Sequence, residues 1–119
     1  MARFGLVPVW AKDPKIIKAT MNARSETIMD KPMWKRPFMK QRALVPATAF
    51  FEWHKTGGKK QKMRVTYRGG EPFCFAGLWD RWAGPPRGTE GAAEPLCSFA
   101  ITTTTPITHS WALFTIGSR

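Results

Sequence analysis

The sequence predicts an α+β fold built on a mainly antiparallel β-sheet with short helices. Short segments rich in β-branched and aromatic residues recur along the chain, and turns rich in glycine or proline separate them. Strands do not alternate with long helices, so a parallel βαβ architecture is disfavoured. The length of 119 residues fits one domain with one modest core.

The first third of the chain is predicted to form a strand, a loop and a short helix. Residues 3–7 are apolar and begin the strand directly after Met1, whereas residues 11–17 contain Asp-Pro and are expected to form a loop. Asp30 is placed to cap a helix that has Pro32 in its first turn. Apolar residues then recur at roughly helical spacing, namely Met33, Trp34, Phe38 and Met39. Pro37 would kink this helix or split it in two.

The rest of the chain is predicted to form strands joined by turns. The expected strands are residues 42–46, 49–54, 63–67, 73–79 and 97–103. Residues 55–62 contain two glycines and several lysines, which indicates a hairpin connection. Gly69 and Gly70 form the next turn, and residues 83–95 form a surface loop. Residues 106–119 have neither strand alternation nor a helix stop signal.

The positive charge is concentrated in one region of the chain. The net charge is +11, and residues 1–70 carry 16 Lys and Arg against 4 acids, whereas residues 71–119 carry 3 against 4. A basic region of this size attracts polyanions by counterion release, and nucleic acid is the commonest target. An anionic membrane surface is less favoured because no basic amphipathic helix accompanies the charge. The alternative is a cationic surface that only confers solubility.

Several functional classes are disfavoured by what the sequence lacks. No apolar run approaches the roughly 18 residues that span a bilayer, and no signal peptide is recognisable, so we expect a cytoplasmic protein. Cys74 and Cys97 lie in apolar runs without metal spacing and are predicted to be small buried hydrophobic residues. His54 and His109 complete no metal-ligand spacing with them, and nothing places Cys97 and His109 together as a nucleophilic pair. We therefore expect no metal or other cofactor.

Two polar features interrupt the apolar pattern and are candidates for a site. Residues 21–27, Met-Asn-Ala-Arg-Ser-Glu-Thr, place Asn22, Arg24 and Glu26 close together, and such groups need water or a polar ligand as partners. Glu52 lies among Phe50, Phe51 and Trp53. If its strand faces a pocket, desolvation would favour the protonated carboxyl and allow general acid or base catalysis.

Each of these residues also has a structural interpretation. Strand alternation would point Glu52 to water and Phe51 and Trp53 inward, and the spacing alone does not decide between this and the pocket. Asn22 can simply cap a turn, and Arg24 can be a surface cation. Trp10 is either a core residue or a stacking platform for an unpaired base, and burial in the core is the favoured interpretation.

Six short motifs occur in a fixed order along the chain. They are Phe4-Gly5-Leu6-Val7-Pro8-Val9-Trp10-Ala11-Lys12-Asp13-Pro14, Asn22-Ala23-Arg24-Ser25-Glu26-Thr27, Leu44-Val45-Pro46, Phe51-Glu52-Trp53, Ala76-Gly77-Leu78-Trp79 and Ile101-Thr102-Thr103. In order and spacing they resemble the SOS response-associated peptidase (SRAP) family of abasic-site processing proteins, over residues 3–103. Any single motif is weak, but six in register are specific.

The resemblance implies a mainly β, partly barrel-like fold with a basic groove for single-stranded DNA. Family members use a cysteine that becomes N-terminal after removal of methionine. Its α-amine condenses with the aldehyde of the ring-opened abasic sugar, and its thiol then closes a thiazolidine, which leaves a stable protein–DNA crosslink. The same cysteine supports autoproteolytic removal of the initiator segment.

Residue roles follow from the resemblance by position. Asn22 would orient the sugar and the reacting amine, and Glu52 would act as acid and base beside that amine. Arg24 would contact a backbone phosphate, while Pro8 and Trp10 would shape the groove that faces DNA. An aldehyde–amine condensation needs a deprotonated amine and a proton donor for the departing water, and one carboxyl group can serve both needs.

The chain departs from the family pattern in two places. Position 2 is Ala, and Met1 aligns with an internal strand of the family, so the cysteine is absent from these 119 residues. The family's later His-Asp-Arg-Met-Pro motif is also missing, because Leu113-Phe114-Thr115-Ile116-Gly117 stands at about that place and His109 lies outside it. We therefore predict an incomplete SRAP domain over residues 1–105 and a divergent tail over residues 106–119.

A frameshift is one hypothesis for this tail. Phe114 to Gly117 can be encoded TTC-ACG-ATC-GGN, and reading from the third nucleotide gives CAC-GAT-CGG, which is His-Asp-Arg. Sequencing the gene tests this, because other codons would not spell the lost motif in the shifted frame.

Three functional hypotheses follow from the sequence. The first is an SRAP-family protein that binds single-stranded DNA at abasic sites in the DNA-damage response, in a copy deficient in crosslinking. We expect this protein to be a monomer without a membrane partner, associated with the nucleoid when it is bound to DNA. The second is a non-catalytic module that binds single-stranded nucleic acid through its basic surface. The third is a gene fragment without a stable fold, since unpaired strand edges would destabilise it.

Overall fold

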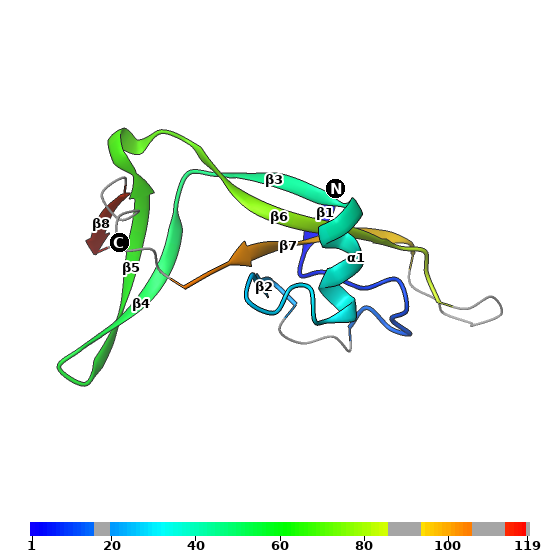
Figure 1. Cartoon of the computed structure of the whole chain (residues 1–119). Helices are drawn as coiled ribbons and strands as arrows, with labels where there is room; N and C mark the ends of the chain where they lie inside the picture. The colour runs from blue at the N-terminus through cyan, green and yellow to red at the C-terminus, as the bar shows by residue number, and fades with distance from the viewer. Residues whose placement is uncertain (16–19, 86–93, 106–113, 119) are drawn as a thin grey trace. The chain divides into compact units, whose positions relative to one another are not determined.

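A computed structural model of the chain describes residues 1–15, 20–85, 94–105 and 114–118, and they form two compact units (Figure 1). The first unit comprises Met1–Val45 and Ala76–Thr104, and the second comprises Pro46–Phe75 and Thr105–Arg119. The described residues fold into mixed and antiparallel β-sheets with one α-helix, which confirms the α+β prediction. No helix among them could span a bilayer, and α1 has only nine residues.

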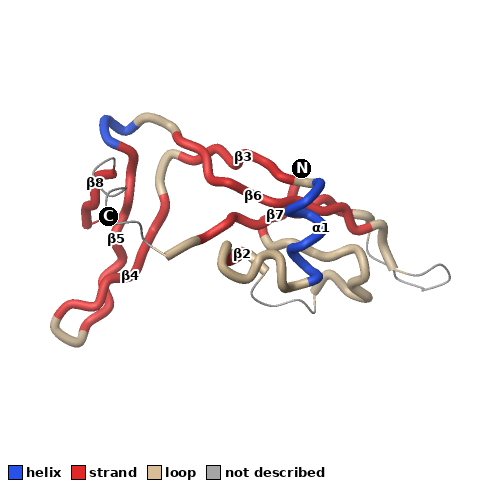
Figure 2. Tube along the Cα trace, in the orientation of Figure 1, coloured by secondary structure: helices blue, strands red, loops and turns tan. Residues whose placement is uncertain are grey.

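The first unit is built around a five-stranded sheet (Figure 2). Its elements are β1 (Ala2–Phe4), β2 (Asn22–Arg24), α1 (Pro32–Lys40), β7 (Leu96–Thr103) and most of β3 (Arg42–Ala47) and β6 (Phe73–Trp82). The end of β3 from Pro46 and the start of β6 up to Phe75 belong to the second unit. The strand order is β1-β7-β6-β3, and β2 also pairs with β7. The strand predicted at residues 3–7 is therefore shorter, and β2 forms where only a polar run was expected.

Strand β7 is the centre of this sheet. It pairs with β6 in antiparallel register from Gly77 opposite Ile101 to Trp82 opposite Leu96. Its other edge is shared by two short parallel strands, because β1 lies opposite Cys97–Phe99 and β2 lies opposite Ile101–Thr103. The chain leaves this edge after β1 and returns to it at β2. The same edge of β7 therefore positions the motifs that begin at Phe4 and at Asn22.

Two glycines permit this arrangement. Gly5 ends β1 with φ of +112°, and a Cβ there would meet Thr20 Oγ1 at 3.3 Å. Gly77 lies in the middle of β6, where a Cβ would meet Val45 Cγ2 at 2.7 Å and the Ala100 carbonyl oxygen at 3.1 Å. The first glycine supplies a left-handed backbone conformation, and the second allows neighbouring chain segments to approach closely.

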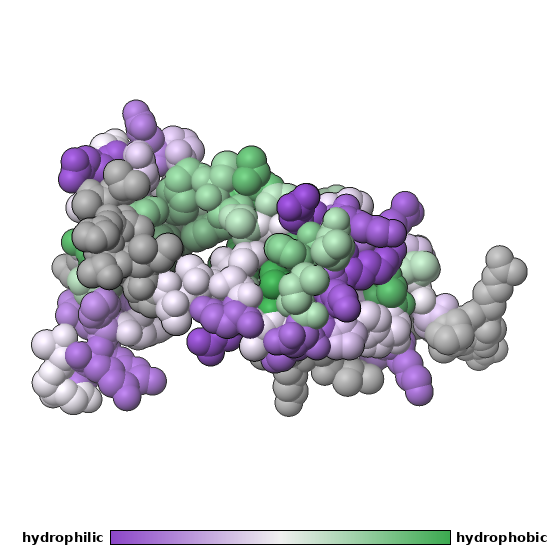
Figure 3. Space-filling view, viewed as in Figure 1, coloured by the Kyte–Doolittle hydropathy of each residue, from purple (hydrophilic) through white to green (hydrophobic). Residues whose placement is uncertain are grey.

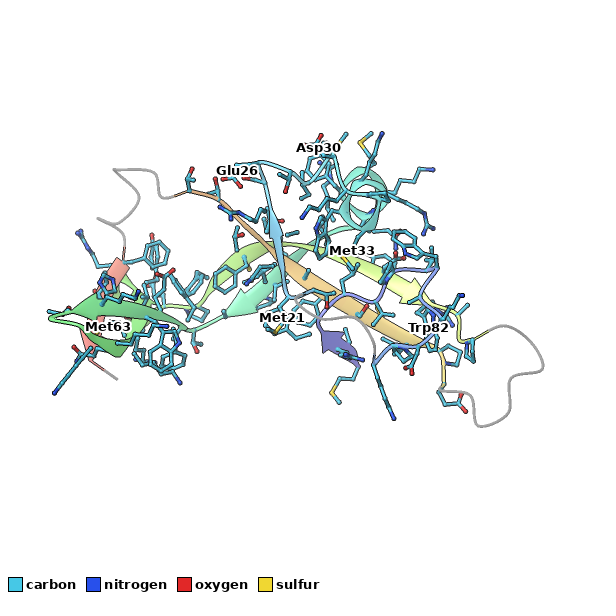
Figure 4. All side chains as sticks on the ribbon, turned by 90° about the horizontal axis from the view of Figure 1, so that it is seen from below. Met21, Glu26, Asp30, Met33, Met63 and Trp82 are labelled. Carbon is cyan, nitrogen blue, oxygen red and sulfur yellow. The ribbon has the colours of Figure 1, made fainter. Side chains whose placement is uncertain are left out.

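The core of the first unit lies between α1 and the sheet. Its buried members are Leu6, Ala23, Ile28, Trp34, Leu78 and Ala100. Met33 and Phe38 pack against them, and Figure 4 shows Met33 between the helix and the sheet. Met39, also expected on this face, is instead exposed.

The helix differs from the prediction at its N-terminus. Its N-cap is Lys31, which has extended φ and ψ and makes no capping side-chain bond, whereas Asp30 is exposed and uses its N–H in a turn with Thr27. Asp30 is therefore not the cap. Pro37 does not split the helix, which runs unbroken to Lys40 with the Pro37 ring buried. Packing of that ring compensates for the backbone hydrogen bond that proline cannot make.

The second unit is a three-stranded antiparallel sheet in the order β4-β5-β8. Its elements are β4 (Phe50–Thr56), β5 (Lys59–Tyr67), the 3₁₀ turn Arg68–Gly70 and β8 (Phe114–Ser118). The hairpin turn is only Gly57-Gly58, and both glycines have positive φ, so the predicted connection at 55–62 was too long. Strand β8 corrects the expectation that residues 106–119 contain no strand, while residues 106–113 lie outside the described part.

Aromatic rings form the packed part of the second unit. Phe50 lies edge-on to Phe73, Phe75 and Phe114, with ring centroids 5.7 to 6.2 Å apart. Tyr67 and Phe114 meet similarly at 5.8 Å. Phe114 pairs with Tyr67 across the β5–β8 ladder, so its place in the cluster follows from the pairing that the sequence pattern missed.

Candidate functional site

Strand β2 presents two polar side chains on one face. Ala23 is completely buried in the core, and strand alternation points Asn22 and Arg24 to the opposite side, where both are exposed. Backbone hydrogen bonds fix the strand, because Ile101 N–H donates to the Met21 carbonyl at 2.9 Å and Ser25 N–H donates to the Thr103 carbonyl at 2.8 Å. The structure thus brings Asn22 and Arg24 together on a rigid element.

The guanidinium of Arg24 has only a weak ionic contact within this strand region. Its Nε lies 3.9 Å from Glu26 Oε2, and both side chains are well exposed. An exposed ion pair at this distance contributes little energy, so an incoming anion can compete for the guanidinium. The face of β2 can therefore offer an amide and a cation to a polar, anionic ligand.

Trp10 lies on a loop that leaves the sheet after β1, and we call residues 6–15 the Trp10 loop. Trp10 is 56% exposed, so the favoured interpretation of it as a core residue was wrong. Pro8 is buried, and its carbonyl accepts the Ala11 N–H at 3.0 Å, which closes a tight turn around Trp10. The buried Pro8 therefore holds the turn in place, while the exposed Trp10 presents an aromatic surface to solvent.

Glu52 belongs to the second unit and is exposed on β4, opposite Met63 of β5. Neither sequence interpretation of its surroundings is correct as stated. Phe51 and Trp53 do not point inward, because they are 51% and 63% exposed, and Glu52 itself is not desolvated. The grouping of Glu52 with Asn22 and Arg24 joins residues of two different units, so it remains a prediction.

The hairpin carries a set of aromatic and basic residues that the sequence interpretation missed, and all of them are exposed except Lys62, which is half-buried. Strand alternation and the β4–β5 register place six side chains on one face, namely Phe51, Trp53 and Lys55 from β4 and Lys60, Lys62 and Arg64 from β5. We call this set the hairpin face. Phe51 lies opposite Arg64, Trp53 lies opposite Lys62, and Lys62 Nζ is 4.4 Å from the centroid of the Phe51 ring.

A signal for the hairpin face was present in the sequence. Cations alternate with other residues at positions 60, 62 and 64, and aromatic residues occupy positions 51 and 53. The period of two is hard to recognise locally, because Lys60 and Lys62 follow Gly57-Gly58 and also fit a charged turn. Figure 3 shows hydrophilic residues near the turn that joins β4 and β5. Exposed aromatic rings interleaved with cations are typical of surfaces that bind single-stranded nucleic acid.

The other candidate residues are the two cysteines and His109. Cys74 is exposed, contrary to the expectation of burial, and Cys97 is half-buried; both are free thiols. His109 lies outside the described residues, so its pairing with Cys97 is untested. Within the described ranges, no three His, Cys, Asp or Glu side chains are grouped closely enough to hold a metal ion.

An open pocket of about 380 Å³ runs along the solvent side of α1. It is lined by Pro32, Lys35, Arg36, Met39 and Lys40. None of the predicted site residues borders it, so it is separate from the face of β2.

These features define a basic α+β protein with a polar site on a strand and exposed aromatic side chains. The family model described as SOS response associated peptidase (SRAP) matches residues 1–113. The chain belongs to the SRAP family, as the six motifs indicated.

Curated relatives and solved structures agree with this assignment. The chain is 41% identical over 105 residues to an abasic site processing protein of Bacillus subtilis, YoqW, which covers 87% of this chain and 44% of the relative. It is 35% identical to the abasic site processing protein HMCES of Gallus gallus, over 85% of this chain and 35% of the relative. The chain thus spans less than half the length of these relatives.

Two solved structures have the same fold. A protein from Bacteroides thetaiotaomicron matches with a TM-score of 0.75 and 31% identity, over 92% of this chain and 47% of that one. A protein from Bordetella bronchiseptica matches with a TM-score of 0.76 and 28% identity, over 96% of this chain and 54% of that one.

Proposed function

We propose that this chain binds single-stranded DNA at abasic sites through the exposed face of β2 and the Trp10 loop. One observation carries the proposal: Asn22 and Arg24 project together from a rigid strand, in a chain whose curated relatives are named abasic site processing proteins. An abasic nucleotide has no base to be read, so a protein must recognise its sugar and the flanking phosphates. An amide and a guanidinium side by side suit that task.

Each residue takes a role consistent with its exposure. Arg24 pairs with a backbone phosphate, for which its weak contact with Glu26 leaves it available. Asn22 orients the sugar by accepting or donating a hydrogen bond, and Trp10 stacks on a neighbouring base. Glu52 acts as acid and base beside the reacting amine in the complete family site, a role that requires it to approach Asn22.

We further propose that the polypeptide of these 119 residues forms no stable crosslink. A thiazolidine requires an amine and a thiol on the same residue, which only an N-terminal cysteine provides. Position 2 is Ala, and the nitrogens of Cys74 and Cys97 are in peptide bonds. Those two thiols can therefore add to an aldehyde only reversibly, and no ring can close.

Two measurements test the proposal. Fluorescence anisotropy compares single-stranded oligonucleotides that carry an abasic site, a stable tetrahydrofuran analogue of that site, or an ordinary base at the same position. We expect tighter binding to the first two, and loss of that preference in Asn22→Ala. Equal affinity for all three oligonucleotides would contradict abasic-site recognition. A band that persists on a denaturing gel with abasic DNA would contradict crosslink deficiency.

The hairpin face supports a second candidate function, a non-catalytic module for single-stranded nucleic acid. Phe51 and Trp53 offer rings for stacking, and Lys60, Lys62 and Arg64 offer charges for phosphates. This function predicts binding that falls with salt but does not distinguish abasic from intact strands. The same set of oligonucleotides therefore separates the two candidates.

A further inference from the structure

We propose that Trp82 and Ser98 are positioning residues that hold the Trp10 loop in its binding conformation without touching the ligand. The inference rests on the proposed function, because it concerns how Trp10 is presented to DNA. Both side chains are completely buried, and each makes one hydrogen bond to the backbone of the loop. In Figure 4, Trp82 lies at the end of β6.

Ser98 fixes the beginning of the loop. It lies on β7 opposite Arg3 of β1 and Asp80 of β6, and its Oγ accepts the N–H of Val7 at 2.8 Å. Val7 is itself buried, so water cannot replace that acceptor. Removing the hydroxyl would leave a buried N–H unsatisfied, which is unfavourable because that N–H loses its partner without regaining water. A serine in the middle of an apolar strand is explained by this single contact.

Trp82 fixes the loop one residue beyond Trp10. Its Nε1–H donates to the Ala11 carbonyl at 2.6 Å, while the Ala11 N–H donates to the Pro8 carbonyl at 3.0 Å. Both backbone groups of Ala11 are therefore engaged. Because consecutive Cα atoms are about 3.8 Å apart, restraint of Ala11 directly limits where the Trp10 backbone can lie.

A third contact restrains the far end of the loop. Arg3 Nη1 donates to the Pro14 carbonyl at 3.2 Å. The three contacts come from β1, β7 and β6, which are neighbours in the sheet. The loop is thus attached at three points, while Val9 and Trp10 between them remain exposed.

This arrangement lowers the entropic cost of binding. An exposed tryptophan on a mobile loop would have to be ordered when a base stacks on it, and ordering costs free energy that is subtracted from the affinity. A loop already fixed at Val7 and Ala11 has less freedom to lose. The buried hydrogen bonds should therefore affect DNA affinity even though their donors and acceptors are covered.

The test compares two loop variants with a control of equal burial. Trp82→Phe retains an aromatic ring and removes the N–H together with the volume by which indole exceeds phenyl, whereas Ser98→Ala removes the hydroxyl with little loss of volume. The control is Asp80→Asn, a buried change on β6 whose partners are Gln41 Nε2, Arg36 and the Arg81 N–H rather than the loop. Each protein is measured for thermal stability, hydrogen–deuterium exchange in residues 5–15, and affinity for single-stranded DNA.

We expect Trp82→Phe to speed exchange in the loop and to weaken DNA binding about fivefold at 25 °C, where the protein remains folded. Ser98→Ala should act in the same direction. Asp80→Asn should lower thermal stability but change neither loop exchange nor affinity. A merely structural role predicts instead that all three variants change affinity only in proportion to the fraction unfolded, and that result would overturn the inference.

Trp10→Ala separates failure of the inference from failure of the proposed function. If Trp10→Ala weakens binding and Trp82→Phe does not, the positioning role is wrong and the stacking role remains. If Trp10→Ala leaves affinity unchanged, stacking on the loop is wrong, and the positioning role fails with it. Unchanged loop exchange in both Trp82→Phe and Ser98→Ala would refute the positioning role by itself.

Discussion

The two compact units bury their side chains in different ways. The first unit has a cluster of buried aliphatic and aromatic residues, and two of its buried polar side chains, Asp80 and Ser98, each have hydrogen-bond partners. In the second unit, Val65 is the one buried side chain among the residues that the structure describes, and half-buried aromatic rings do most of the packing.

This difference bears on how each unit can serve function. Buried side chains and paired polar groups hold a strand such as β2 in one conformation, so Asn22 and Arg24 can be placed accurately. A sheet packed through half-buried rings leaves large aromatic residues such as Trp53 available to solvent. Substitutions in the buried core of the first unit should therefore affect stability most. Substitutions of exposed side chains on β2, the Trp10 loop or the hairpin face should affect binding and leave stability nearly unchanged.

Leu78→Ala should give the largest effect on stability. Leu78 is buried in the core of the first unit, and leucine-to-alanine changes at such sites cost about 2–5 kcal/mol. The matched change in the second unit is Ile116→Ala on β8, where the exposed side chain should cost less than about 1 kcal/mol. Thermal melts followed by far-UV circular dichroism measure both.

The outcome also tests whether the chain folds. Equal losses of thermal stability in Leu78→Ala and Ile116→Ala would contradict the difference in burial between the two units. Absence of a cooperative transition in the unsubstituted protein would instead support the hypothesis of a fragment without a stable fold.

Gly77→Ala should destabilise the first unit by about 1–3 kcal/mol. The added methyl would meet Val45 Cγ2 at 2.7 Å and the Ala100 carbonyl at 3.1 Å, and the backbone oxygen has little room to move. Gly117→Ala on β8 is the control, because nothing lies within 4 Å of a Cβ at that position. Urea denaturation of both variants measures the difference, and equal stability would show that β3 and β7 can relax around the methyl group.

Local patterns were enough to predict most elements of the fold. Runs of apolar and aromatic residues between turns located β3, β4, β6 and β7, alternation located the second half of β5, and the spacing of Met33, Trp34 and Phe38 located α1. Strand β2 was missed because three residues are too few for a periodic signal, and its pairing with Ile101–Thr103 depends on contacts distant in sequence. Strand β8 was missed for the same reason, since pairing with β5 defines it.

The candidate site was predictable in part. The motif around Asn22 and Arg24 indicated polar residues that need a partner, and strand alternation explains why both are exposed. Trp10 was misassigned because a large aromatic residue near apolar neighbours normally enters a core. The loop that carries it bonds to Trp82 and Ser98, residues more than 70 positions away, and no local pattern can reveal such contacts.

Trp53→Ala and Trp10→Ala test whether DNA stacks on the hairpin face or on the Trp10 loop. Stacking of a base on an aromatic ring contributes about 1–3 kcal/mol, so each substitution should weaken single-stranded DNA binding about tenfold if its ring is used. Both rings are more than half exposed, and neither change should cost much stability. Anisotropy titrations at constant salt compare them. An effect of Trp53→Ala alone would favour the non-catalytic module, and an effect of Trp10→Ala alone would favour the site at β2.

Arg24→Ala should give the smallest effect, and it tests the exposed face of β2 most directly. Loss of one phosphate contact should weaken binding about fivefold at low salt and reduce the slope of log K against log[salt] by about 0.7 for a single strand. Arg42→Ala removes the same charge from β3, where the side chain is also exposed, and should leave that slope unchanged. If both variants lower affinity alike and neither changes the slope, Arg24 acts only through net charge. The phosphate contact would then be assigned to the cations of the hairpin face, whose substitution should reduce the slope instead.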